Sequence, residues 1–328
     1  MRRIELTLST GPDGSGRIAM TAFLPHPSIA RNSVIFASPG GGYARGYYDL
    51  RFDGHADYSQ AEHHVARGHV VVAYDHLGCG HSSTDRLDTL TIEDIAAHNH
   101  DAVSAVADRI RGGTLAEGFP AIPRAAMIGI GQSMGGGVSI IMQARHGSFD
   151  AVGVLGYSAI HTVLPQPNER AFERAADAYR FDRGTPGSAL SVEAVSAEVM
   201  DFVYPFHWED VPDDIVEADM AGGFPIRRTV PWFASGTIPN CVVAMMGPGY
   251  VREEAAAIDV PVFLAFGERD VSRDPRAEPA AFAAASDITL SIVPRMAHMH
   301  NFASTRRLLW DRLSGWADAV ARTGAGDQ

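Results

Sequence analysis

The chain has 328 residues, and 39 acidic side chains against 27 basic ones give it a formal net charge of −12. That sign is wrong for a protein that neutralises the phosphates of DNA or RNA, so we expect no nucleic-acid partner. All 27 basic residues are arginine, and the lack of lysine excludes Schiff-base chemistry, pyridoxal-phosphate anchoring and the phosphate-binding lysine of a Walker loop.

The N-terminal residues predict the antiparallel edge of a sheet. Residues 4–9 alternate apolar and polar side chains, and residues 17–24 can pair with them. The first ten residues, MRRIELTLST, lack the apolar stretch of a signal peptide, and no run of about 18 apolar residues follows. Cys79 and Cys241 are the only cysteines, so a disulfide framework is not expected. We therefore expect a cytoplasmic protein with no membrane partner.

The rest of the chain alternates between strand patterns and helix patterns. Six short, apolar segments rich in β-branched residues predict buried strands at residues 33–37, 69–74, 125–130, 151–155, 260–266 and 288–293. Apolar side chains at helical spacing predict helices at residues 94–111 and 305–321. This alternation predicts an α/β fold, with a mostly parallel sheet of about eight strands flanked by helices.

The alternation stops in the middle of the chain. Residues 160–257 are rich in proline, glycine, aromatic residues and methionine, which predicts a helical cap inserted into the α/β core. Residues 1–159 and 258–328 then form the two parts of that core. Trp208 and Trp232 belong to an aromatic group in the cap that either packs it onto the core or walls a pocket, so we treat both as candidate substrate contacts.

A candidate nucleophile follows the predicted strand 125–130. Gly131 and Gly135 flank Ser133, and a helical pattern comes directly after them. Two glycines at this spacing permit a sharp turn that presents the serine hydroxyl above the strand ends, next to a helix N-terminus. The alternative is an ordinary glycine-rich turn between a strand and a helix.

A serine hydroxyl needs a base to take its proton, and the base needs an orienting acid. Asp270 follows the predicted strand 260–266, and His298 follows the predicted strand 288–293. His300 lies two residues further on and either supports this loop or contacts substrate. Glu268 is interpreted as a solvated or loop-bonded neighbour. The four residues after strand 151–155 include no carboxylate, which favours Asp270 as the acid.

This order of serine, acid and histidine, each at the end of a strand, resembles the α/β-hydrolase superfamily. The resemblance covers the chain outside the cap and implies that His298 takes the Ser133 proton while Asp270 orients the imidazole. It also implies two N–H donors for the oxyanion, from Met134 and from the loop at residues 38–43. Within that loop Gly41 is the first candidate and Gly42 the second, and Tyr43 is a candidate substrate contact. Many relatives carry His-Gly where this loop has Pro-Gly.

Further family patterns concern structure and metal binding. Residues 75–82 are similar to the family's D-x-x-G-x-G-x-S loop, which we interpret as structural. His98 and His100 fall on different faces of a predicted helix, and no histidine pair has a third ligand at a recognisable spacing. We therefore expect neither a metal nor another cofactor.

The resemblance implies a serine hydrolase that cleaves an ester or lactone of a small to medium, mainly apolar compound. Serine at position 133 argues against the haloalkane dehalogenases and epoxide hydrolases, which use aspartate. Hydrolysis of a carbon–carbon bond in ring-cleavage products stays open, because those relatives use the same triad, and so does a non-catalytic, ligand-binding member of the fold. A fixed cation facing substrate would be an arginine, with Arg45, Arg269 and Arg295 nearest to the predicted loops. The oligomeric state, including a homodimer, also stays open.

Overall fold

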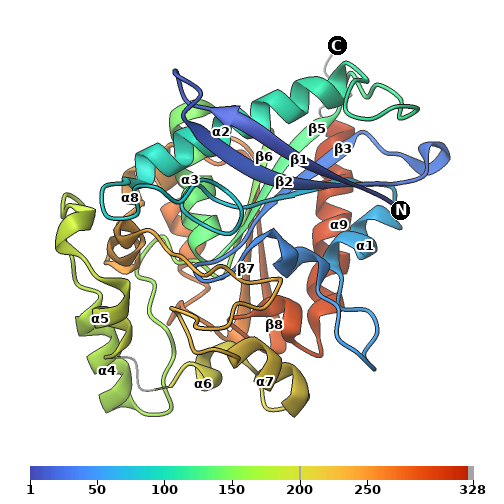
Figure 1. Ribbon diagram of the computed structural model, residues 1–328. Coiled ribbons are helices and arrows are strands. Elements are labelled where there is room, and N and C mark those ends of the chain that lie inside the picture. Colours follow the sequence, from blue (N-terminus) through green and yellow to red (C-terminus); the bar gives the residue numbers. More distant parts are fainter. Residues whose placement is uncertain (199–200, 324–328) are drawn as a thin grey trace.

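The computed structural model describes residues 1–198 and 201–323, which contain a single sheet of eight strands in the order β1-β2-β4-β3-β5-β6-β7-β8 (Figure 1). The strands are β1 (Arg2–Thr10), β2 (Gly16–Leu24), β3 (Ser33–Ser38), β4 (Val70–Tyr74), β5 (Ala126–Gln132), β6 (Ala151–Leu155), β7 (Val262–Arg269) and β8 (Ile288–Ala297). β1 pairs antiparallel with β2, and β2 with β4, while all other pairs are parallel. The predicted fold class is confirmed.

Helices cover both faces of this sheet. The α-helices are α1 (Gln60–Val65), α2 (Ile92–Arg111), α3 (Met134–His146), α4 (Glu169–Ala178), α5 (Val192–Ser196), α6 (Val203–Phe206), α7 (Asp213–Met220), α8 (Arg252–Ala257) and α9 (Arg306–Thr323). Six short 3₁₀ helices in the described chain are η1 (Pro27–Ile29), η2 (Arg45–Asp49), η3 (Gly187–Ala189), η4 (Asn240–Met246), η5 (Glu278–Ala281) and η6 (His300–Phe302). α2, α3 and α8 form one layer, and α1 and α9 form the other. Within residues 1–198 and 201–323, no helix combines the length and apolar character needed to span a bilayer.

The central strands are buried because both faces carry helices. β3, β4, β5 and β6 are buried along their whole length, which explains their continuous apolar sequences. The predicted helix 94–111 corresponds to α2, which begins at a capping box formed by Thr91 and Asp94. Its buried residues recur at helical spacing and face the sheet.

The last two strands run further than their apolar patterns indicate. β7 continues to Arg269 and β8 to Ala297, and these two residues are paired across a bulge near Gly267. Pairing between strands extends the regular structure beyond the apolar segments. As a result, Asp270 and His298 leave adjacent strands at the same edge of the sheet.

The predicted cap segment, residues 160–257, contains α4 to α8 together with η3 and η4. In Figure 1, α4 to α7 lie beyond one end of the sheet. α8 instead packs against α3 in the core layer. The segment predicted as a cap therefore ends with a helix that packs on α3, and the sequence of α8 carries no signal that separates it from the preceding helices.

Candidate active site

Ser133 lies at the junction of β5 and α3 in a backbone conformation that few non-glycine residues adopt. Its φ is 53° and its ψ is −121°. A Cβ on Gly131 would collide with the backbone of Gly135, and one on Gly135 would collide with the backbone of Ser38. The two glycines thus allow strand, turn and helix to approach closely, and the turn presents the serine hydroxyl at the strand end.

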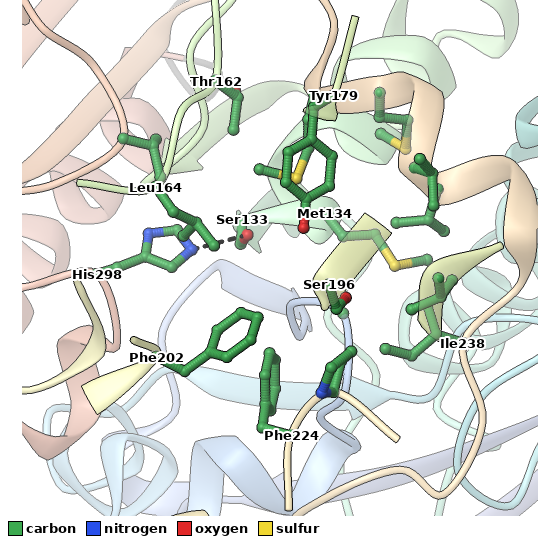
Figure 2. A pocket seen from close by; sticks show the side chains of 18 of the residues that line it. Ser133, Met134, Thr162, Leu164, Tyr179, Ser196, Phe202, Phe224, Ile238 and His298 are labelled. Carbon is green, nitrogen blue, oxygen red and sulfur yellow. Dashed lines mark hydrogen bonds between the residues drawn. The ribbon is translucent and has the colours of Figure 1, made fainter. Parts of the chain in front are cut away.

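The structure brings the three predicted triad residues together. The Nε2 atom of His298 is 2.9 Å from the Ser133 hydroxyl oxygen, and its Nδ1 atom is 2.7 Å from a carboxylate oxygen of Asp270 (Figure 2 shows the first of these bonds). The Gln132 side-chain amide donates to the His298 carbonyl at 3.0 Å, which fixes the loop. The imidazole can therefore exchange a proton with Ser133 while the carboxylate holds its other nitrogen.

Asp270 is buried, and its carboxylate accepts hydrogen bonds from three groups besides His298. Its carboxylate accepts the N–H groups of Gly267 and Val271, each at 2.8 Å, and the Nε2–H of His300 at 2.7 Å. Burial alone would raise the pKa of Asp270, but the two imidazoles outweigh it and hold that pKa below its usual range. The group is therefore an anion held by four donors.

The loop after β3 passes directly over the nucleophile. A Cβ on Gly40 would collide with the Gln132 side chain and lie 3.0 Å from the Ser133 Cβ. Gly41 and Met134 line the same cavity as Ser133, and no acceptor among the described residues receives either backbone N–H. Both N–H groups are thus unengaged donors beside the nucleophile, as an oxyanion site requires.

Gly42, the second oxyanion candidate, has a different structural role. Its φ is +81°, and an added Cβ would come within 2.7 Å of the Phe224 ring. Gly42 is needed where the loop turns beneath an aromatic side chain of the cap segment. The geometry therefore favours Gly41 as the loop donor.

A narrow cavity of about 90 Å³ opens above Ser133 (Figure 2). Most of its wall is apolar and comes from the cap segment, with contributions from Leu164, Phe202, Phe206, Phe224, Ile238, Met245 and Met246. Among the described residues that line the cavity, the titratable side chains are His298 and two tyrosines. None of these lining residues is an arginine, aspartate, glutamate or cysteine. The predicted aromatic group thus lines the cavity through Phe202, Phe206 and Phe224, and its tryptophans do not.

The four predicted substrate contacts lie elsewhere, and these predictions are corrected. His300 lies behind Asp270. Tyr43 is buried and donates its hydroxyl to Asp219 at 2.8 Å. Trp208 faces the Arg269 guanidinium, 4.7 Å from its ring centre, and Trp232 is 50% exposed. Their aromatic character suggests a substrate contact, but Trp208 packs against Arg269 and Trp232 is exposed to solvent, so neither lines the cavity.

A buried charged cluster in the cap segment has no counterpart in the sequence reasoning. Asp219 accepts from the Tyr43 hydroxyl, lies 2.9 Å from the His207 Nε2 atom and forms an ion pair with Arg227 at 3.3 Å. Burial, followed by the Asp219 charge, raises the pKa of Tyr43 well above its usual value. Because Tyr43 follows Gly42, the cluster attaches the loop after β3 to α7. No local sequence motif predicts this cluster, because its members are not adjacent in the sequence.

The predicted arginines are engaged away from the cavity. Arg45 pairs with Asp75 at 2.5 Å, in the loop interpreted as structural. Arg269 pairs with Glu209, and Arg295 pairs with Asp210 at 3.0 Å. Each guanidinium therefore already has a carboxylate partner.

The structure places neither cysteine in a reactive position and brings together no metal-binding group among the described residues. Cys79 and Cys241 are both buried, and burial raises the pKa of each thiol. Across the part of the chain that the structure describes, no group of three histidine, cysteine or acidic side chains could hold a metal ion.

Comparisons with known proteins identify structural neighbours. No protein-family model matches the chain, and no curated protein sequence matches it. A carboxyl esterase from Bacillus coagulans has a TM-score of 0.65 at 16% identity, over 98% of this chain and 99% of its own. A thermophilic esterase from Thermogutta terrifontis has a TM-score of 0.62 at 14% identity, over 97% and 99%.

A third neighbour shows the range of chemistry on this scaffold. A loop variant of a haloalkane dehalogenase from Bradyrhizobium elkanii has a TM-score of 0.63 at 14% identity, over 99% of both chains. Identities this low establish architecture and leave the reaction to the site. The strand order, the turn that carries Ser133 and this set of neighbours together show that the chain has the α/β-hydrolase fold.

Proposed function

We propose that the protein is a serine hydrolase that cleaves a carboxylic ester or lactone of a small, uncharged, mainly apolar compound. The observation that carries this proposal is the chain of contacts from Ser133 through His298 to Asp270, at 2.9 and 2.7 Å, at the floor of an apolar cavity. Esterases among the structural neighbours support it as analogy.

The mechanism begins with proton transfer. His298 accepts the Ser133 proton as the serine oxygen bonds to the carbonyl carbon, and Asp270 stabilises the imidazolium that forms. The N–H groups of Gly41 and Met134 donate to the developing oxyanion. Collapse of the tetrahedral intermediate breaks the ester C–O bond, and His298 returns the proton to the departing alcohol.

Water completes the cycle. His298 removes a proton from a water molecule, whose oxygen attacks the acyl-enzyme carbonyl, and the second tetrahedral intermediate releases the carboxylic acid and restores Ser133. A lactone follows the same path, but its alcohol stays attached to the acyl group.

The uncharged substrate follows from the cavity wall. A carboxylate or ammonium group moved from water into an apolar space without a partner loses several kcal/mol of solvation, on the order of the effective penalty measured for buried ions. No arginine or carboxylate among the described residues lines the cavity to compensate for this lost solvation. The cavity therefore selects neutral groups.

A fluorophosphonate probe tests the proposal directly. The folded wild-type protein should be labelled, and Ser133→Ala should not be. Ser15→Ala, at an exposed serine between β1 and β2, is the control and should label as the wild type does. Absence of labelling on folded wild-type protein would reject the serine-nucleophile assignment in favour of a ligand-binding role.

A substrate panel then identifies the bond that is cleaved. p-Nitrophenyl esters of increasing chain length are compared with lactones and with a carbon–carbon cleavage substrate. We expect turnover of short esters or lactones, in keeping with the 90 Å³ cavity. Turnover confined to the carbon–carbon substrate would keep the triad and replace the proposed substrate class.

A further inference from the structure

The polar groups of the active-site cavity divide into two kinds. The Tyr157 hydroxyl donates to the Met245 carbonyl at 2.7 Å, and the Thr162 hydroxyl exchanges hydrogen bonds with the backbone of Ser158 at 3.0 and 3.2 Å. These two hydroxyls are satisfied by the protein itself. Ser133 and His298 belong to the triad, which leaves two lining hydroxyls to be explained.

The remaining hydroxyls belong to Tyr179 and Ser196. Tyr179 follows α4 and Ser196 ends α5, and the two residues are 6% and 8% exposed. Burial raises the pKa of Tyr179, and the neighbouring Ser196 hydroxyl partly offsets this rise. The two hydroxyls are therefore neighbours, and a hydroxyl that bonds to its neighbour still has a proton or a lone pair for a ligand.

Figure 2 shows where these groups point. The Tyr179 ring reaches into the cavity with its hydroxyl on the side of Ser133 and Met134, and the Ser196 hydroxyl faces the same space. Phe202, Phe224 and Ile238 surround that space with apolar surface. A polar group that enters the cavity meets these two hydroxyls on an otherwise apolar wall.

A ligand oxygen that enters an apolar cavity without a hydrogen-bond partner loses about 1–3 kcal/mol, and a hydroxyl on the wall that bonds to it removes that loss. The pair can donate to a keto oxygen, or can donate to and accept from a hydroxyl group, so it suits either neutral oxygen. A carboxylate would lose its hydration and meet no cation on the described wall.

We propose that Tyr179 and Ser196 form a specificity subsite that binds a neutral keto or hydroxyl oxygen of the substrate, separate from the carbonyl that Ser133 attacks. This inference rests on the proposed hydrolase function and narrows its substrates to small oxygenated esters or lactones. The pair contributes binding and orientation, and it takes no part in the proton transfers.

Binding to an inactive protein tests the subsite without turnover. Calorimetry on Ser133→Ala compares p-nitrophenyl hexanoate with p-nitrophenyl oxohexanoates and hydroxyhexanoates whose oxygen is moved along the chain. At least one oxygenated ester should bind about tenfold or more tightly than the hexanoate, in line with one recovered hydrogen bond. Equal affinity across the whole series would overturn the proposal.

Double variants assign the preference to residues. In Ser133→Ala/Tyr179→Phe the affinity ratio of the oxygenated ester to the hexanoate should fall about tenfold, and Ser196→Ala should lower the same ratio less. Tyr157→Phe is the matched control, because its hydroxyl is already bonded to backbone, and it should leave the ratio unchanged. An unchanged ratio in the Tyr179 variant would refute the subsite.

Turnover by the active protein separates the two proposals. If fluorophosphonate labels Ser133 and the hexanoate is hydrolysed without any preference for oxygenated esters, the subsite fails and the hydrolase stands. If the oxygenated ester binds selectively to protein that is neither labelled nor active, the hydrolase fails and the subsite stands.

Discussion

His300 provides the sharpest test of how the triad is arranged. The His300→Ala substitution removes one of the four donors to the Asp270 carboxylate and leaves the bonds from Gly267, Val271 and His298. A hydrogen bond to a charged group contributes about 1.5–3 kcal/mol. If all of it were lost from the transition state, kcat would fall about 10- to 100-fold, since each 1.4 kcal/mol corresponds to a factor of ten.

The His298→Ala substitution removes the base itself and should lower kcat by about four orders of magnitude or more. Steady-state kinetics on a short p-nitrophenyl ester therefore separate the two variants by at least about 100-fold. KM should change little in His300→Ala, because His300 does not contact the cavity. His300→Gln should restore part of kcat, since its amide can donate to Asp270 as the imidazole does.

One outcome would refute this reasoning. If His300→Ala is folded, judged by an unchanged near-UV circular dichroism spectrum, and is as inactive as His298→Ala, then His300 acts in proton transfer. A rise in KM without a fall in kcat would instead place His300 against substrate.

Three further predictions concern stability. Because the pKa of Asp270 is lowered on folding, its contribution to stability is fully present above its unfolded value of about 3.9 and is lost as pH falls through the folded value. The difference in unfolding free energy between wild type and Asp270→Asn, measured in urea at several pH values, should therefore shrink below about pH 4, and a constant difference would contradict this. Gly42→Ala combines a strained φ with an aromatic clash, whereas Gly54→Ala at φ +78° meets open space, so Gly42→Ala should cost more than the roughly 1–2 kcal/mol of backbone strain alone. Equal urea midpoints for the two variants would exclude the clash. Asp219→Ala leaves the buried Arg227 charge without its carboxylate and should destabilise by about 3–5 kcal/mol, whereas a shift below about 1 kcal/mol would mean that water or another group compensates.

The convergence of the three proposed triad residues could be predicted because each follows directly after a strand. Apolar segments locate the strands, and a parallel sheet brings their carboxyl ends to one edge, so Ser133, Asp270 and His298 converge whatever the cap does. The same logic located the Gly41 loop. For these residues, the local sequence identifies the strand ends and the parallel topology of the sheet brings those ends together.

The cavity wall could not be predicted in this way. Tyr179 follows α4 and Ser196 ends α5, and the sequences of these helices show only that one side is buried. The packing of the helices against the core decides which side chains face Ser133. Residue type alone predicts Trp208 and Trp232 as substrate contacts, but Trp208 lies against the Arg269 guanidinium and Trp232 is exposed to solvent. The Asp219 cluster joins residues from the core loop and the cap, and no spacing rule connects these.

In the proposed reaction, the uncharged wall of the cavity also affects how the catalytic cycle ends. Hydrolysis converts a neutral substrate into a carboxylic acid, which is ionised at neutral pH. No cation among the described residues that line the cavity can pair with the new charge. The anion is better solvated in bulk water than beside Phe202 or Met245, so the reaction itself lowers the affinity of the site for what it has made. Product departure is then favoured by the same surface that admitted the substrate.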